Sequence, residues 1–150
     1  MSTKEDILNA LIDSAEVRYD ELFGSEDHIG KIPENREEFI NVTMGRVSFT
    51  MKDPVIRKIR MLLVQEQFRN ERISEVTTKH QLEGIQGMFA KIIKGMMEAG
   101  IVVKDDPKLL AVELTAPAVL QIARSDRQPQ REEECLECIE RHLKHFCRYI

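Results

Sequence analysis

The sequence predicts an all-α domain, and three observations lead to this fold class. Apolar residues recur at the three- and four-residue spacing of amphipathic helices along nearly the whole 150-residue chain, and no stretch alternates as a half-buried strand would. The pairs Asp53-Pro54 and Asp106-Pro107 are typical helix starts. The 7 glycines and 5 prolines are too few for a turn-rich β fold. We therefore expect six helices in one domain over residues 1–150.

The first three helices are predicted from their end signals. The segment Ser2–Asp6 holds a capping box, and Gly24 has the usual role of a residue just beyond a helix, so the first helix should cover residues 4–23. A second helix is expected over about residues 35–51. In the third, Asp53 caps and Pro54 takes the first helical position, where its missing N–H costs nothing. Its apolar stripe continues to Phe68.

The remaining three helices follow the same logic. Asn70 either breaks or bends the chain before a long helix over about residues 72–99, which Gly100 ends. The fifth helix is expected over about residues 106–124, with Asp106 as its cap. Pro129 then opens a sixth helix that has three glutamates in its first turn and a basic last part. Both charge biases complement the helix dipole.

Composition narrows the function classes. The net charge is −4 and the pI is near 5.6, so the chain by itself is a poor nucleic-acid binder. No run of about 18 apolar residues exists, which predicts no membrane span. The N-terminal residues do not form a signal peptide. Three cysteines without an export signal indicate reduced thiols, and we expect a cytoplasmic protein.

The last two helices carry more apolar surface than one small domain can bury. The fifth is apolar nearly all round, and a helix of that kind is covered on every side. The sixth has a regular apolar stripe at three- and four-residue spacing. A second copy of the chain would cover the surplus, which predicts a homodimer. The residues expected at its interface are Leu110, Leu114, Leu136, Ile139, Leu143 and Phe146.

The chemistry-bearing candidates are weak, and no catalytic residue and no cofactor are predicted. Cys135 and Cys138, with His142 and His145 close by, have the residue types of a zinc site. On one straight helix, however, these positions would span about 15 Å at 1.5 Å per residue, too far for one tetrahedral ion. Buried thiols beside rim histidines are the favoured interpretation, so no metal is predicted. A pair from each of two chains at a dimer interface is the alternative.

Four residues point to unusual packing in the middle of the chain. Gly84, Gly87 and Gly95 each cost roughly 1 kcal/mol relative to alanine inside a helix. Pro117 costs about 3 kcal/mol inside the fifth helix, because it lacks an N–H and its ring clashes with the preceding turn. Glycines facing a kinked helix fit two interpretations. Either another helix crosses closely, or a ligand cavity opens there.

The order and spacing of several motifs resemble the C-terminal effector-binding and dimerisation domain of the TetR family of transcriptional regulators. The likeness covers nearly the whole chain, although each motif alone is loose. It is carried by Ser2–Leu8, which resembles the "SKEDIL" segment that opens the linking helix of the family, by Gln65–Asn70, by Glu98–Ile101 followed by Asp106–Ala111, by Thr115–Ala118, and by Arg127–Pro129.

This resemblance implies an all-α domain that forms a homodimer through its last two helices, residues 105–150, as a four-helix bundle. It also implies that residues 1–23 form or contain the linking helix, and that a small, mostly apolar effector controls DNA binding through this helix. The DNA-reading helix-turn-helix of the family, about 45 residues, has no counterpart in this sequence. Operator recognition therefore belongs to a full-length regulator, and this chain alone is not expected to bind DNA.

The implied pocket should lie between the second to fifth helices and be bordered by the first. Apolar walls with a few orienting polar groups are typical of such sites. The expected lining residues are Phe39, Thr43, Val47, Gln67, Phe68, Met88, Phe89, Ile92 and Leu114, of which Thr43 and Gln67 are the polar groups. The alternative function is a helical homodimer with a structural or protein-binding role, in which side chains fill this space.

Overall fold

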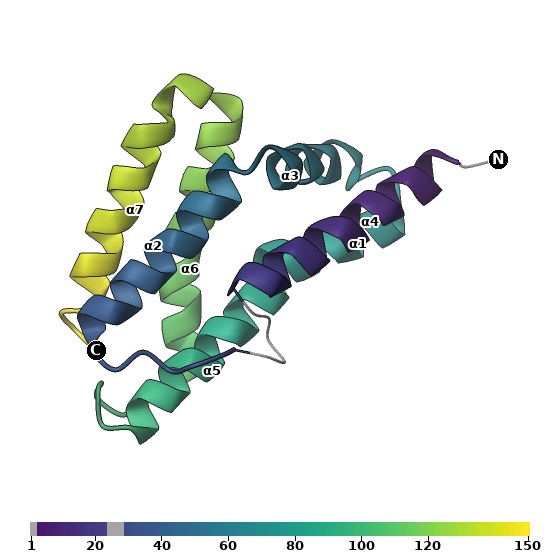
Figure 1. The fold of residues 1–150 in the computed structure, drawn as a ribbon. Helices are drawn as coiled ribbons and strands as arrows, with labels where there is room; N and C mark the ends of the chain where they lie inside the picture. Colours follow the sequence, from purple (N-terminus) through teal and green to yellow (C-terminus); the bar gives the residue numbers. More distant parts are fainter. Residues whose placement is uncertain (1–2, 24–28) are drawn as a thin grey trace.

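The computed structural model describes residues 3–23 and 29–150, and their regular structure is entirely helical (Figure 1). The all-α class is therefore confirmed. The elements are α1 (Lys4–Phe23), α2 (Arg36–Lys52), α3 (Pro54–Glu66), α4 (Glu71–Thr78), the π-helical turn η1 (Lys79–Glu83), α5 (Gly84–Glu98), α6 (Pro107–Arg127), the 3₁₀ turn η2 (Pro129–Arg131) and α7 (Glu132–Phe146). Counting α4, η1 and α5 as one continuous helix, the described residues form the six helices expected.

Side-chain caps start most of these helices where the sequence indicates. The backbone N–H of Asp6 donates to Thr3 Oγ1 and that of Thr3 to Asp6 Oδ2, each at 3.1 Å, which is a reciprocal capping box. Asp53 Oδ2 accepts from the N–H of Ile56, and Asp106 caps α6 in the same way. The predicted stop at Gly24 lies outside the described residues.

The long predicted helix over residues 72–99 is correct in extent but contains a feature that the sequence analysis missed. It begins at Glu71 because Asn70 is its N-cap, so Asn70 breaks the chain rather than bending it. Residues Lys79–Glu83 form a π-helical turn, in which the N–H of Gly84 donates to the carbonyl of Lys79. A Cβ on Gly84 would lie 2.9 Å from that oxygen. Gly84 therefore permits the π turn rather than a helix crossing or a cavity.

Two helix ends differ in how well they were predicted. After α5, Gly100 has φ +75° and its N–H donates to the carbonyl of Met97, while the N–H of Ile101 donates to Met96. This pair of bonds is the Schellman arrangement expected of a stop glycine. Helix α7 ends at Phe146, earlier than the apolar pattern suggested, although Ile150 still lies in the core.

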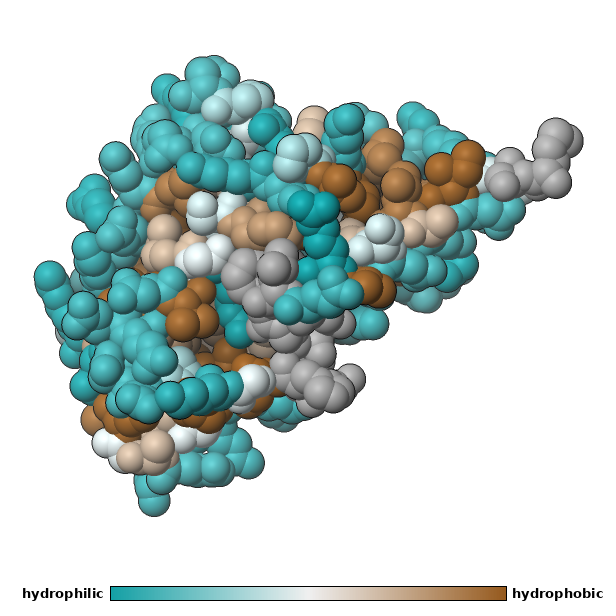
Figure 2. All heavy atoms as spheres, in the orientation of Figure 1, coloured by the Kyte–Doolittle hydropathy of each residue, from teal (hydrophilic) through white to brown (hydrophobic). Residues whose placement is uncertain are grey.

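Two separate hydrophobic cores divide the helices into a body and an arm. In Figure 1, α2, α6 and α7 lie side by side and α5 crosses them, and these four helices surround the larger core. The arm consists of α1, α3 and α4 and has its own small core of Leu8, Ile12, Ile59, Leu63 and Ile73. Figure 2 shows further apolar side chains on the surface of the arm, along α1 and its neighbours.

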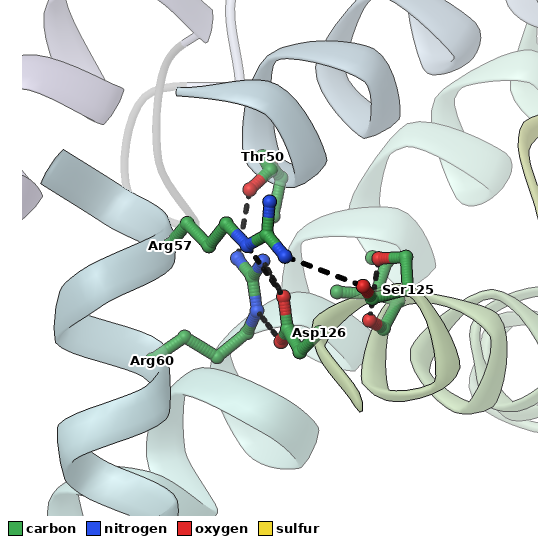
Figure 3. A network of polar contacts seen from close by, with 6 residues as sticks. Thr50, Arg57, Arg60, Ser125 and Asp126 are labelled. Carbon is green, nitrogen blue, oxygen red and sulfur yellow. Dashed lines mark hydrogen bonds and ion pairs between the residues drawn. The ribbon is translucent and has the colours of Figure 1, made fainter. Parts of the chain in front are cut away.

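A polar network joins the arm to the body (Figure 3). Arg60 of α3 donates to both carboxylate oxygens of Asp126 near the end of α6, at 2.6 and 2.7 Å, and to the carbonyl of Thr50 at 2.7 Å. The Arg57 guanidinium lies 3.6 Å from Asp126 and donates to the carbonyl of Ser125. Arg60 and Asp126 are largely buried, so the pair is weakly screened by solvent. We name these residues the arginine–aspartate clamp.

Polar contacts also hold α1 along its length. Lys4 Nζ lies 2.7 Å from Glu66 Oε1 at the end of α3, and Arg18 lies 2.7 Å from the buried carboxylate of Asp53 at its start. Helices α1 and α3 are therefore antiparallel. Between these two points Glu16 Oε1 lies 2.8 Å from Nε2 of His80 in the π turn. Helix α1 thus makes polar contacts with both ends of α3 and with the π turn.

Candidate functional site

Most of the predicted ligand-lining residues come together in the core of the body. Phe39, Thr43 and Val47 of α2, Met88, Phe89 and Ile92 of α5, and Leu114 of α6 are all buried. The rings of Phe39 and Phe89 meet edge to face, with centroids 6.3 Å apart and planes at 88°. The structure therefore places these seven positions on the inner faces of three different helices.

The structure separates the other two predicted lining residues from this group. Gln67 and Phe68 lie in the turn after α3, at the arm's end. Gln67 donates to the carbonyl of Val64, and Phe68 is 91% exposed. The sequence analysis extended the apolar stripe of the third helix to Phe68, whereas α3 ends two residues earlier, at Glu66. It therefore assigned Phe68, which lies on the surface, to the expected core.

Side chains fill the space among the buried group. A Cβ on Gly95 would lie 2.6 Å from Ile32 Cδ1, so this glycine admits a side chain from the segment before α2. That contact favours the close-packing interpretation of Gly95. Two depressions of the described surface lie elsewhere, one between α2 and α7 beside Glu37 and Lys144, the other along α7. Both are open and lined in part by charged groups.

The sequence analysis missed one residue of this site, Arg46. It lies on α2 three residues after Thr43 and seven after Phe39, a spacing that places all three on one helix face. It is 6% exposed, and its Nη1 donates to Met88 Sδ at 2.9 Å. The helical spacing indicates that Arg46 shares a face with Phe39 and Thr43. Arginine is almost never fully buried, however, so its residue type predicted an exposed position.

No family model, no curated protein and no solved structure matches the chain. In the described part of the chain, no helix is long and apolar enough to cross a membrane.

The residues expected at a dimer interface all lie in the core of the single chain. Leu110, Leu114, Leu136, Ile139, Leu143 and Phe146 are buried against the chain's own helices. The apolar surplus of α6 lies instead at Leu109, Val112 and Leu120, which are 53%, 41% and 70% exposed. With Ala116, these residues form one stripe, because offsets of three, seven and eleven fall within about 80° around a helix. We name this set the α6 stripe.

Helices α6 and α7 pack as an antiparallel pair. Arg124 near the end of α6 pairs with Glu134 near the start of α7, and His142 near the end of α7 contacts the carbonyl of Leu114 at 3.0 Å. This contact lies beside Pro117, whose ring prevents normal hydrogen bonding in the preceding turn. The carbonyl that loses its donor to Pro117 is that of Glu113, four residues earlier, and His142 contacts the neighbouring carbonyl of Leu114.

The cysteines in and just after α7 do not form a common site with His142 and His145. Cys135 and Cys147 are buried and Cys138 is exposed. Burial raises the pKa of the Cys135 thiol, and burial raises the pKa of Cys147 to about 11, so both stay protonated at neutral pH. A thiolate is the form that binds metal. Among the described residues, no three His, Cys, Asp or Glu side chains are placed to hold an ion.

Proposed function

We propose that this chain is the ligand-sensing and dimerisation domain of a transcriptional regulator of the TetR type. The observation that carries this proposal is the antiparallel α6–α7 pair with its exposed α6 stripe. Two such pairs, one from each of two copies, can form a four-helix bundle that buries the stripe. In this arrangement the arm, which begins with α1, would transmit ligand binding in the body to DNA-binding helices. Those helices would lie outside these 150 residues.

The bundle proposal predicts a homodimer that depends on the α6 stripe. Replacing Leu120 with glutamate should weaken self-association by roughly 100-fold or more, because two symmetry-related charges would be desolvated in an apolar contact. The monomer fold should persist, since Leu120 is exposed. Sedimentation velocity at micromolar concentration measures the result. Leu82→Glu, a similar change at an exposed leucine of the π turn, is the matched control and should remain dimeric.

Two outcomes would contradict this part of the proposal. One is a wild-type protein that sediments as a monomer at micromolar concentration. The other is a Leu120→Glu variant that associates as strongly as the wild type, which would place any interface elsewhere.

The ligand-sensing part predicts that an apolar compound stabilises the protein. A ligand at 100 times its Kd adds about 2.7 kcal/mol, which should raise Tm by roughly 5–10 °C in a domain of this size. Gly87→Leu, on α5 one residue before Met88, should abolish the shift but leave dimerisation nearly intact. Differential scanning fluorimetry with a broad hydrophobic panel measures both variants. Gly45→Leu is the control, because a Cβ there meets nothing within 4 Å.

One observation favours the alternative function, a helical homodimer that binds no ligand. The buried residues of the candidate site fill the space between α2, α5 and α6. If no compound in the panel raises Tm, or if Gly87→Leu unfolds the protein while Gly45→Leu does not, the ligand pocket is wrong and only the dimer remains.

A further inference from the structure

The surface beside the second half of α7 concentrates positive charge. An open depression there is lined by one thiol and five basic side chains, and by no acidic one: Cys138, Arg141, His142, Lys144, His145 and Arg148. The chain as a whole has a net charge of −4, so this surface runs against the average charge. The depression on the other side of α7 differs, because Glu37 and Glu140 line it together with Lys144. We name the first one the cationic depression.

The two arginines of the cationic depression are not used by the fold. The side chains of Arg141 and Arg148 make no hydrogen bond or ion pair with any other residue that the structure describes. Lys144 pairs with Glu140 at 2.9 Å, but the two side chains are 58% and 46% exposed. Exposed pairs of this kind contribute little to stability, so the Lys144 ammonium can turn to another anion at small cost.

The dipole of α7 accounts for only part of this cluster. Cations in the last turn of a helix offset the partial negative charge of its terminal carbonyls, and the last turn of α7 contains Lys144 and His145. This effect falls off within one turn. Arg141 lies before the last turn, so a favourable contact with the helix end is not a sufficient reason for its charge.

The extent of the cluster indicates a compact anion. At 1.5 Å per residue, Arg141 and Arg148 lie about 10 Å apart along the axis, with Lys144 between them. Their long side chains can converge over that distance on one ligand. Guanidinium forks bind phosphate oxygens two at a time, and an ammonium adds a point charge. A chain of two or three phosphates places several negative charges within this short span.

We propose that the cationic depression binds a small anion that carries a diphosphate or triphosphate group. Arg141 and Arg148 would donate to phosphate oxygens from the two ends, and Lys144 would exchange Glu140 for the anion between them. The depression lies on the outside of α7, apart from the buried residues of the candidate ligand pocket. The inference therefore goes beyond the proposed function and does not depend on it.

Isothermal titration calorimetry at low salt with pyrophosphate and citrate tests the proposal. The two probes carry similar negative charge near neutral pH, but only pyrophosphate presents phosphate oxygens. The wild type should bind pyrophosphate roughly 10-fold or more tightly than citrate, because tetrahedral phosphate groups suit two guanidinium forks better than carboxylates on a flexible chain do. Added salt should weaken the binding, since the cations are exposed.

Variants of the two arginines locate the site. Arg141→Gln and Arg148→Gln should each weaken pyrophosphate binding roughly 10-fold, because each removes a charge-assisted hydrogen bond. Both residues are exposed, so both variants should keep the wild-type melting temperature. Arg127→Gln is the matched control. Arg127 ends α6, about 20 Å along that helix from the Leu114 carbonyl that His142 contacts, and its loss should change the affinity less than about twofold.

Cys138 provides a second readout that needs no variant. It is exposed and lines the cationic depression, whereas Cys135 and Cys147 are buried. A neutral disulfide reagent such as dithiodipyridine should therefore react with Cys138 first. Saturating pyrophosphate should slow this reaction several-fold, because the bound anion covers the thiol. Citrate at the same concentration should have a much smaller effect.

Several results would overturn the proposal. A wild-type protein that binds no pyrophosphate at low salt has no such site. Equal affinity for citrate would show that the surface attracts anions without recognising phosphate. Undiminished binding by both arginine variants, or an unchanged reaction rate of Cys138, would place the anion elsewhere on the chain. None of these measurements involves the α6 stripe or an apolar ligand, so a failure here leaves the proposed function intact, and the reverse also holds.

Discussion

The Ile139→Glu variant is expected to lose a large part of the free energy of unfolding. Ile139 is 1% exposed and lies in the main core, where α7 packs on the rest of the body. Glutamate there would bury an unpaired carboxylate and remove a packed side chain. We expect a loss of more than about 4 kcal/mol, against a total stability of roughly 5–15 kcal/mol for a domain. Far-UV circular dichroism and a thermal melt measure the effect.

The matched control is Val103→Glu, which makes the same kind of change at a β-branched residue that is exposed after α5. It should melt within about 2 °C of the wild type, because surface substitutions change stability by about 0.5 kcal/mol or less. If Ile139→Glu also melts cooperatively near the wild-type temperature, Ile139 does not lie in the core of the monomer. Its burial would then depend on a second copy, as the apolar pattern of α7 alone suggested.

Breaking the arginine–aspartate clamp should cause the second large loss. Asp126→Asn keeps the shape of the side chain but leaves Arg60 and Arg57 beside a neutral amide. Removing one partner of a largely buried ion pair strands the other charge, and we expect a loss of about 3 kcal/mol, or roughly 6–12 °C in Tm. Urea denaturation gives the free energy of unfolding directly.

Glu133→Gln is the control for the clamp, because it removes an ion pair with Lys52 whose two side chains are both well exposed. Exposed pairs contribute about 0–1 kcal/mol, so this variant should match the wild type closely. A loss below about 1 kcal/mol for Asp126→Asn would mean that the clamp does not hold the arm to the body. The joint between the two cores would then depend on apolar contacts and on the continuous α4–η1–α5 segment.

Local signals in the sequence determined where most helices begin and end. The carboxylates of Asp53 and Asp106 accept from backbone N–H groups two or three residues later, and Gly100 takes a positive φ. Each of these effects involves only a few neighbouring residues, so the sequence is sufficient to predict it. The π turn was not predictable in this way. Its extra residue is inserted into a helix whose apolar pattern continues on both sides.

Only the tertiary structure decided which apolar faces turn inward. Helix α6 is apolar nearly all round, so its composition could not show that Leu110 and Leu114 are buried while Leu109 and Leu120 face solvent. The same holds for Arg46, whose helical spacing predicts burial and whose charge predicts exposure. Caps act over one helical turn, whereas burial depends on which distant helices pack together. That choice depends on the summed packing of the whole chain, which no single stretch of sequence contains.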